Sequence, residues 1–368
     1  MTRLIVICLL LFSAETVLAQ KETKKSSRPS YSKLKRESSQ RELDDLLNRA
    51  EALRAEAPNR ALDLIKDALA ISIVRQDVLA ESRCYNLMGE INLGIEEWKL
   101  ALENFTTSGN KLDEAGLEGT REKHQALAGL AKASIALKNF PAALRYLEEL
   151  RKAPADSVTL ADAEVDLAEV YYVLGNYNAA LDALTRGEKL ISDESQMRAR
   201  IEHQKARILA RTDQMEESYR RFQSGQNILR SRPARQAPAQ EAEVRKAKEE
   251  ISEVYEQQKR YDEKIDLLNS SIDFNRDMKN FGEVANDKVE LSNTLIAKGD
   301  RSAALKELEE AATIADTINN PRQQARAYLS LADLYESSGN THEALRTYRK
   351  YSDAVARAET ELENRMLE

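Results

Sequence analysis

The 368-residue sequence is poor in residues that form turns or cross-link chains, with only 12 glycines, 7 prolines and 2 cysteines. Aromatic residues make up 5% of it. A β-sandwich or β-barrel needs frequent glycine- and proline-containing turns between β-branched strands, so this composition excludes both folds. Beyond residues 4–12 there is no long apolar run, and those nine residues fall short of the roughly 20 needed to span a bilayer as a helix.

Residues 1–19 have the pattern of an export signal. Arg3 supplies a positive charge, the apolar run of residues 4–12 follows, and residues 17–19 precede a cleavage point at Gln20. We therefore expect an exported, periplasmic protein whose mature chain begins at Gln20 and has no transmembrane span.

Cleavage of residues 1–19 would also change the number of cysteines. Their removal takes Cys8 away and leaves Cys84 alone, so no internal disulfide can form. Cys84 has apolar neighbours and is expected to be a small buried side chain. Residues 20–40 interleave lysine, arginine and serine around Pro29, which is typical of a basic flexible linker.

The residues that are abundant favour helices. Charged residues make up 32% of the sequence and apolar residues 42%, with alanine, leucine, glutamate, lysine and arginine prominent. These are good helix formers, and the apolar share is enough for a core, so an all-α fold is expected. The formal net charge of −7 gives no general attraction to nucleic acid, and none is expected as a partner.

One pattern recurs along the chain after residue 40. A small residue is followed 12 positions later by a second, then by a bulky apolar residue and another small one, as in Ala168, Ala180, Leu184 and Gly187. Such spacing allows one helix to end, a turn to form and an antiparallel helix to begin, with small residues where the two approach. The second position recurs at intervals of 37 to 46 residues, close to 40 on average, at Ala61, Ala101, Ala143, Ala180, Ser218, Lys264, Ala304 and Ala344.

Glycines mark the turns of three copies. Gly175, Gly299 and Gly339 each lie five residues before the second small position. A glycine there can end the first helix in a left-handed conformation. We therefore expect a short helix–helix turn at each of the three.

The repeated units resemble tetratricopeptide repeats, whose pattern is W-x2-L-G-x2-Y followed by A-x3-F. The best copies are Leu167-Ala168-x2-Tyr171 with Ala180-x3-Leu184, and Leu331-Ala332-x2-Tyr335 with Ala344-x3-Tyr348. The resemblance implies a right-handed α-solenoid of about eight helix pairs. The period exceeds the family's usual 34 residues, which longer helices would explain. HEAT-type repeats have a long period too, but the small–small–bulky pattern argues against them.

The domain organisation follows from these segments. We predict repeats one to five over residues 41–230 and a proline-containing loop over 231–241 that divides the solenoid. Repeats six to eight then occupy 242–351, and a separate amphipathic C-terminal helix occupies 352–368.

No pattern of catalytic or metal-binding residues is present. The sequence has no glycine-rich phosphate loop, CxxC, HExxH or calcium loop, and His124, His203 and His342 lie in different repeats. We expect no enzyme activity and no cofactor. Two functions stay open: an exported scaffold that binds a peptide or protein segment in a concave groove, and a sensory ectodomain. The second follows from a resemblance to exported arrays of membrane-bound two-component histidine kinases or transcription regulators, whose transmembrane and output domains this chain lacks.

The resemblance also implies a location for the binding groove, because in tetratricopeptide arrays the first helix of each pair lines the concave face. Carrying over the family's groove positions places Arg200, His203, Arg207 and Arg211 of the fifth repeat at a basic centre. An acidic patch of Glu249, Glu253 and Glu256 follows in the sixth. Arginine forks bind carboxylates bidentately, so the expected partner segment carries acidic groups. The other repeats add Arg83, Asn86, Lys132, Asn286 and Asn293.

Overall fold

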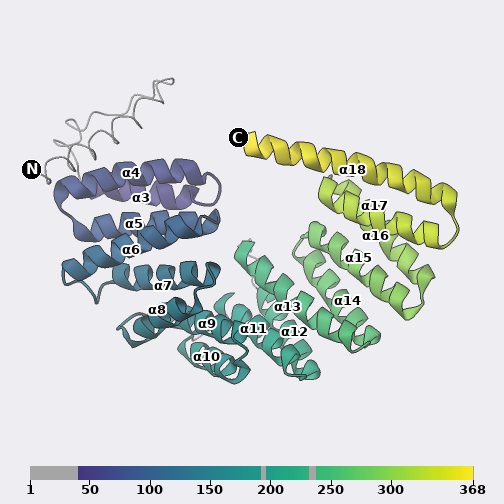
Figure 1. Ribbon diagram of the computed structural model, residues 1–368, viewed down its shortest axis with the longest axis horizontal. Coiled ribbons are helices and arrows are strands. Elements are labelled where there is room, and N and C mark those ends of the chain that lie inside the picture. The colour runs from purple at the N-terminus through teal and green to yellow at the C-terminus, as the bar shows by residue number, and fades with distance from the viewer. Residues whose placement is uncertain (1–39, 192–195, 232–237, 368) are drawn as a thin grey trace, which may run out of the picture. The chain divides into compact units, whose positions relative to one another are not determined.

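The computed structural model describes residues 40–191, 196–231 and 238–367 (Figure 1). Within these ranges the chain forms sixteen helices and no strand. The all-α class and the eight helix pairs are thus confirmed. The export signal at 1–19 and all but the last residue of the linker at 20–40 lie outside the described residues.

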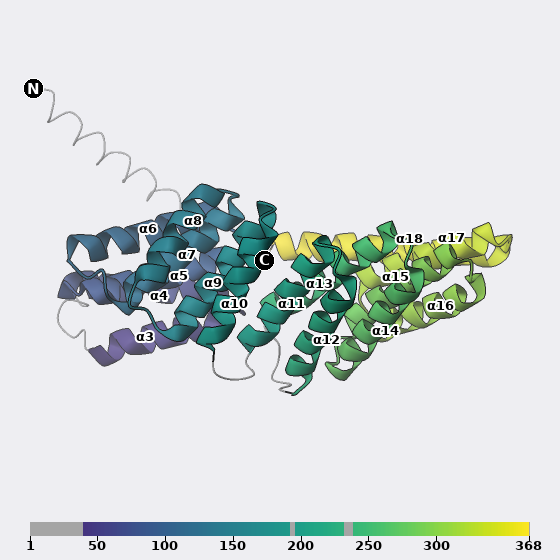
Figure 2. The ribbon, with the colours of Figure 1, turned by 90° about the horizontal axis from the view of Figure 1, so that it is seen from below.

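The chain divides into two compact units between Leu117 and Glu118, in a connection that contains Gly116 and Gly119. Unit 1 holds the first two pairs and unit 2 the other six (Figures 1 and 2). The helices of unit 1 are α3 (Gln40–Leu53), α4 (Pro58–Arg75), α5 (Val78–Gly94) and α6 (Trp98–Glu114). Those of unit 2 are α7 (Arg121–Ala136), α8 (Phe140–Lys152), α9 (Ser157–Val173), α10 (Tyr177–Leu190), α11 (Gln196–Arg211), α12 (Met215–Ser231), α13 (Pro238–Gln257), α14 (Tyr261–Asp277), α15 (Phe281–Lys298), α16 (Arg301–Thr317), α17 (Pro321–Ser337) and α18 (Thr341–Leu367).

Three sequence-based boundaries need correction. The predicted loop at 231–241 is shorter, because α12 includes Ser231 and α13 begins at Pro238, a residue well suited to a first helical position. The unit boundary also falls elsewhere, and α13 packs directly on α11 within unit 2. The C-terminal helix at 352–368 is not a separate element, since α18 runs unbroken from Thr341 to Leu367 without a glycine or proline.

The small residues of the repeat lie where paired helices touch. A Cβ added at Gly89 would come within 2.6 Å of the Phe105 ring, which is the bulky residue of the same repeat. In the fifth repeat the Ser218 hydroxyl donates to the backbone carbonyl of Ala206 at 2.7 Å, which joins the two small positions. The repeat pattern therefore specifies the helix–helix contacts and the core between them.

The turns follow the predicted glycines. Gly175, Gly299 and Gly339 all have positive φ, and Gly299 ends α15 as its left-handed C-cap. Elsewhere the same left-handed position is taken by residues such as Lys138 and Lys279. Asparagine or aspartate usually follows and caps the next helix, so the turn is conserved in geometry between repeats even where its glycine is not.

Helix length accounts for the long period. α15 and α16 contain 18 and 17 residues, which together already exceed a 34-residue repeat before any turn is added. In unit 1, Cys84 is buried as predicted and lies 3.9 Å from the Ser72 hydroxyl. Burial raises the pKa of its thiol to about 11, so the thiolate is scarce at neutral pH.

Candidate functional site

The first helices of unit 2 form one continuous run of neighbours in its central part. α7 packs on α9, α9 on α11 and α11 on α13, in addition to the contact of each with its own second helix. Charged side chains at equivalent positions of neighbouring repeats therefore come into contact.

Arg200 of α11 lies between two aspartates of α9. Its guanidinium donates to Asp162 at 2.6 Å and to Asp166 at 2.9 Å, and Lys132 of α7 donates to Asp162 at 2.5 Å. Burial acts to raise the pKa of Asp162, but the charges of Lys132 and Arg200 outweigh it and lower that pKa. Burial, aided by the charge of Asp162, raises the pKa of Asp166. Cations from two helices are thus fixed by one pair of carboxyl groups.

Arg207, two turns further along α11, bridges α9 to α13. Only 4% of it is exposed. Its guanidinium lies 2.7 Å from Glu169 of α9 and 2.8 Å from Glu250 of α13, with its Cζ atom 4.6 Å from the centre of the Tyr172 ring. The bidentate fork of arginine is suited to such a double contact.

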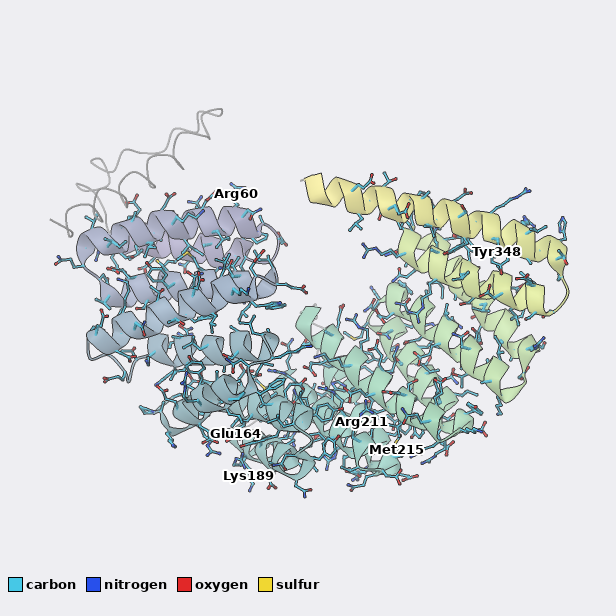
Figure 3. All side chains as sticks on the ribbon, viewed as in Figure 1. Arg60, Glu164, Lys189, Arg211, Met215 and Tyr348 are labelled. Carbon is cyan, nitrogen blue, oxygen red and sulfur yellow. The ribbon has the colours of Figure 1, made fainter. Side chains whose placement is uncertain are left out.

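Arg211 ends the series (Figure 3). It donates to Glu253 at 3.0 Å and to the Tyr172 hydroxyl at 3.2 Å. Tyr172 in turn donates to Glu250. Burial, together with this bond to Glu250, raises the pKa of Tyr172 to about 12, so the hydroxyl keeps its proton. We call the residues joined by these contacts the ion-pair ladder: Lys132, Asp162, Asp166, Glu169, Tyr172, Arg200, Arg207, Arg211, Glu250 and Glu253.

The ion-pair ladder shows that the basic centre predicted from sequence is already paired with carboxylates of this chain. The sequence placed Arg200, Arg207 and Arg211 on one surface, and the structure does bring them together along α11. Their forks, however, already bind carboxylates of α9 and α13, of which the sequence-based groove included only Glu253. The acidic patch is also partnered, since Glu253 bonds Arg211 and Glu256 lies 2.6 Å from Lys264.

His203 lies apart from the arginines. It is 1% exposed, and its ring packs on α12, with the Phe222 ring centre 5.6 Å away and Nε2 facing Gly225. A Cβ on Gly225 would come within 2.5 Å of Nε2, so this glycine makes room for the imidazole. Burial lowers the pKa of His203 to about 4, and the ring is neutral at physiological pH.

The remaining candidate residues are dispersed. Arg83 and Asn86 belong to unit 1, where Arg83 lies 4.0 Å from Asp44 and Asn86 is buried. Glu249 is exposed on α13, 3.9 Å from Arg245. On α15, Asn286 accepts from Arg326 at 3.4 Å and Asn293 is exposed. None of these joins the ion-pair ladder through a described contact.

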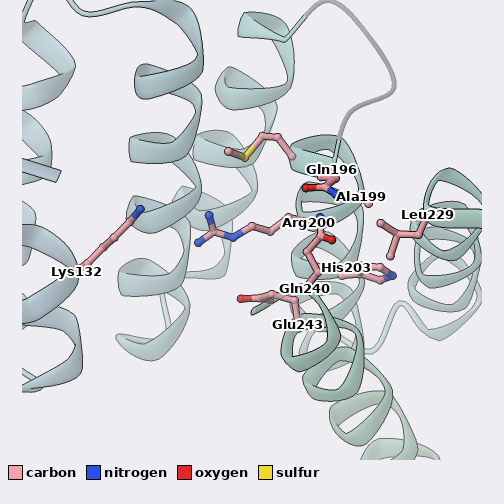
Figure 4. A pocket seen from close by; sticks show the side chains of 9 residues that line it. Lys132, Gln196, Ala199, Arg200, His203, Leu229, Gln240 and Glu243 are labelled. Atoms are coloured by element: carbon pink, nitrogen blue, oxygen red, sulfur yellow. The ribbon is translucent and has the colours of Figure 1, made fainter. Parts of the chain in front are cut away.

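A cavity of about 420 Å³ opens beside the ladder, between α11, the end of α12 and the start of α13. We call it the α11–α13 cavity (Figure 4). In the view of Figure 4, Arg200 extends from α11 toward Lys132, whereas His203 extends toward Leu229. Its lining consists of Lys132, Gln196, Met197, Ala199, Arg200, His203, Leu229, Gln240 and Glu243.

The sequence missed the carboxylates of α9 although it held a signal for them. Asp162 and Arg200 both lie six residues before the small residue of their repeat, Ala168 or Ala206. Glu169 and Arg207 likewise both lie one residue after it. The groove register applied to the fourth repeat therefore places an acid at the positions equivalent to Arg200 and Arg207. Gln240 and Glu243 had no such signal, because they precede the matched part of the sixth repeat.

The described residues hold no group of three or more histidine, cysteine or acidic side chains arranged for a metal ion. Within the same part of the chain, no helix combines the length and hydropathy needed to cross a membrane.

Comparison with known proteins identifies the repeat. Residues 325–353, which fall in α17 and α18, match the family model described as tetratricopeptide repeat. This helix pair is thus a tetratricopeptide repeat by sequence, and the other helix pairs share its fold. Among the curated proteins, none matches it by sequence.

Solved structures of tetratricopeptide-repeat proteins share the fold at low sequence identity. A signal transduction ATPase with numerous domains from Pyrococcus horikoshii, which has a tetratricopeptide repeat sensor, is 16% identical over 90% of this chain, with a TM-score of 0.53. The chain covers 54% of that protein, about half its length. The apo form of RapI is 14% identical over 86% of this chain and 98% of its own, also with a TM-score of 0.53. At such identities the likeness establishes the fold alone.

Proposed function

We propose that the protein is a non-catalytic scaffold that binds a peptide or protein segment on the first-helix surface of unit 2. The observation that carries this proposal is the α11–α13 cavity, which is lined by residues of three first helices, α7, α11 and α13. Repeat arrays bind partners along extended surfaces made by successive first helices, so an open cavity there is a natural anchor point.

The ion-pair ladder supports a binding role for this surface. Arg200 and Arg211 are held in fixed positions by carboxylates, so little side-chain entropy would be lost when a partner contacts them. A partner can therefore add to a preformed polar surface, with no helix moving to create it.

Photo-crosslinking tests the proposal. A photoreactive phenylalanine analogue replaces Gln196, which is exposed and lines the cavity, and a matched variant carries it at Lys189, exposed on the second helix α10. Each variant is irradiated with a tagged random peptide library. We expect peptide adducts at residue 196 and few at residue 189. Equal labelling of the two, or no adduct at residue 196, would contradict binding at this surface.

A sensory module of a larger signalling protein is the second candidate. It is favoured by the Pyrococcus horikoshii relative, which is described as having a tetratricopeptide repeat sensor and of which this chain covers about half. Reading the coding sequence beyond Glu368 tests this candidate. A following hydrophobic span and output domain would support it, and an immediate stop codon would contradict it.

Export to a periplasm is part of the proposal, on the strength of residues 1–19. Mass spectrometry of the protein from separated cell fractions should find Gln20 as the first residue in the exported fraction. An intact Met1 in the cytosol would contradict export and leave the binding proposal unaffected.

A further inference from the structure

The α11–α13 cavity has room for one long side chain of a partner. Its volume of about 420 Å³ lies within the range of pockets that hold small ligands, roughly 300–1,000 Å³. Met197 and Leu229 line it with apolar surface. Such walls favour a chain of methylene groups, which gains free energy by leaving water.

Two oxygen atoms on the α13 side of the cavity lack hydrogen-bond partners among the described residues. They are Oε2 of Glu243 and Oε1 of Gln240, and both are buried. The two residues are three positions apart on α13, so their side chains lie on the same face of the helix. Buried acceptors are nearly always satisfied in folded proteins, and the described residues supply no donor to this pair.

The cations among the described residues do not supply that donor. Arg200 donates to Asp162 and Asp166, and Lys132 donates to Asp162. Arg207 is nearest to Glu243, yet its Nη1 lies 4.0 Å from Oε2, beyond hydrogen-bond distance, and is bonded to Glu169 instead. The cavity therefore offers a ligand apolar walls and two acceptor side chains, while its two cations, Lys132 and Arg200, are bonded to aspartates of α9.

We propose that the cavity takes a lysine or arginine side chain of the bound segment. Its methylene groups lie against Met197 and Leu229, and its ammonium or guanidinium group donates to Glu243 and Gln240. This inference rests on the proposed scaffold function. It also replaces the acidic partner that the arginines of α11 suggested from sequence with a basic one, because carboxylates of α9 and α13 already neutralise those arginines.

Histidine NMR reads the cavity directly, since the ring of His203 lines it. The chain has three histidines, and His124 on α7 and His342 on α18 do not line the cavity, so they serve as internal controls. The full chain with isotope-labelled histidine is titrated with the N-acetyl N-methylamides of lysine, arginine, norleucine and glutamate. We expect the lysine or arginine derivative to shift the His203 signal saturably, while norleucine and glutamate leave it unchanged.

A matched pair of variants then tests the acceptor. Glu243→Gln and Glu249→Gln make the same charge change on α13, but Glu249 is 58% exposed at its side chain and lies outside the cavity. Charge-assisted hydrogen bonds are strong, so Glu243→Gln should weaken lysine or arginine binding about tenfold. Glu249→Gln should leave it unchanged.

The outcomes separate this inference from the proposed function. Saturable binding of the glutamate derivative, or equal binding of norleucine and lysine, would overturn the cation site. So would the absence of any His203 shift. These comparisons use the unaltered protein and hold even if Glu243→Gln fails to fold. Peptide adducts at residue 196 would still support the scaffold, since that experiment does not depend on the charge of the bound group.

Discussion

Removal of the Arg207 side chain should strongly destabilise the centre of unit 2. Arg207→Ala deletes the contacts to Glu169 and Glu250 and the stacking on Tyr172. Two largely buried carboxylates then lose their main cation. Breaking a buried ion pair by removing one partner costs about 3–5 kcal/mol, because the remaining charge stays in a poorly solvated place.

The structure places the expected cost near the lower end of that range. Glu250 keeps Arg211 at 3.8 Å and the bond from Tyr172, and Glu169 keeps Lys246 at 4.0 Å. We therefore expect about 3 kcal/mol, which corresponds to roughly a hundredfold increase in local opening. Arg220→Ala is the control, because Arg220 is 72% exposed at its side chain and pairs with Glu217 one turn away. Such surface pairs contribute about 0–1 kcal/mol.

Native-state hydrogen exchange measures the effect where it arises. Arg207→Ala should speed exchange of the slow amides of α11 and α13 and leave those of α3–α6 unchanged. Arg207→Lys should fall between the two, since an ammonium keeps the charge but cannot fork between two carboxylates. If Arg207→Ala costs no more than Arg220→Ala, the ion-pair ladder does not hold these helices together.

Three further predictions concern local features of the repeats. Gly89→Ala should lower the free energy of unfolding in urea by about 1–3 kcal/mol, because its Cβ would meet the Phe105 ring, and adding Phe105→Leu should restore part of the loss. Gly94→Ala, with no atom near its Cβ, should be neutral or slightly stabilising. Similar losses for both variants would refute the close contact. Lys138→Gly should increase the free energy of unfolding by up to about 1 kcal/mol and so raise the thermal midpoint, because Lys138 has a φ of 58°, a conformation that glycine adopts without strain. A lower midpoint would contradict this. Asp156 caps α9, and hydrogen bonds from Thr159 lower its pKa, so its charge stabilises the fold above about pH 4 and that contribution is lost as the pH falls through the lowered pKa. Asp156→Ala should cost about 1 kcal/mol at neutral pH and less in acid, whereas Asp156→Asn should behave alike at both; a pH-independent deficit in Asp156→Ala would argue against the charged cap.

The helix pairs were predictable from sequence because their contacts are local. Gly89 and Phe105 belong to one repeat, and the recurring spacing of small and bulky residues predicts the contact between them. Gly299 similarly marks its own turn. Lys138 does not, since a left-handed lysine has no signature in a single sequence, and the surrounding helices impose its conformation.

The candidate site was predictable only in part. Arg200, Arg207 and Arg211 lie together on α11, as expected from their spacing, but their function depends on groups from neighbouring helices. Whether an arginine is free or paired is decided by Asp162 and Glu250, 38 and 43 residues away in the chain. The α11–α13 cavity depends on where α13 begins, and sequence placed that start several residues too late.

Hydrogen exchange of the protein with a library-selected peptide tests the central claim most directly. If the scaffold binds on the first-helix surface of unit 2, saturating peptide should slow exchange in α9, α11 and α13, and leave the second helices α10 and α12 unchanged. Protection confined to α10 and α12, or to unit 1, would contradict the account.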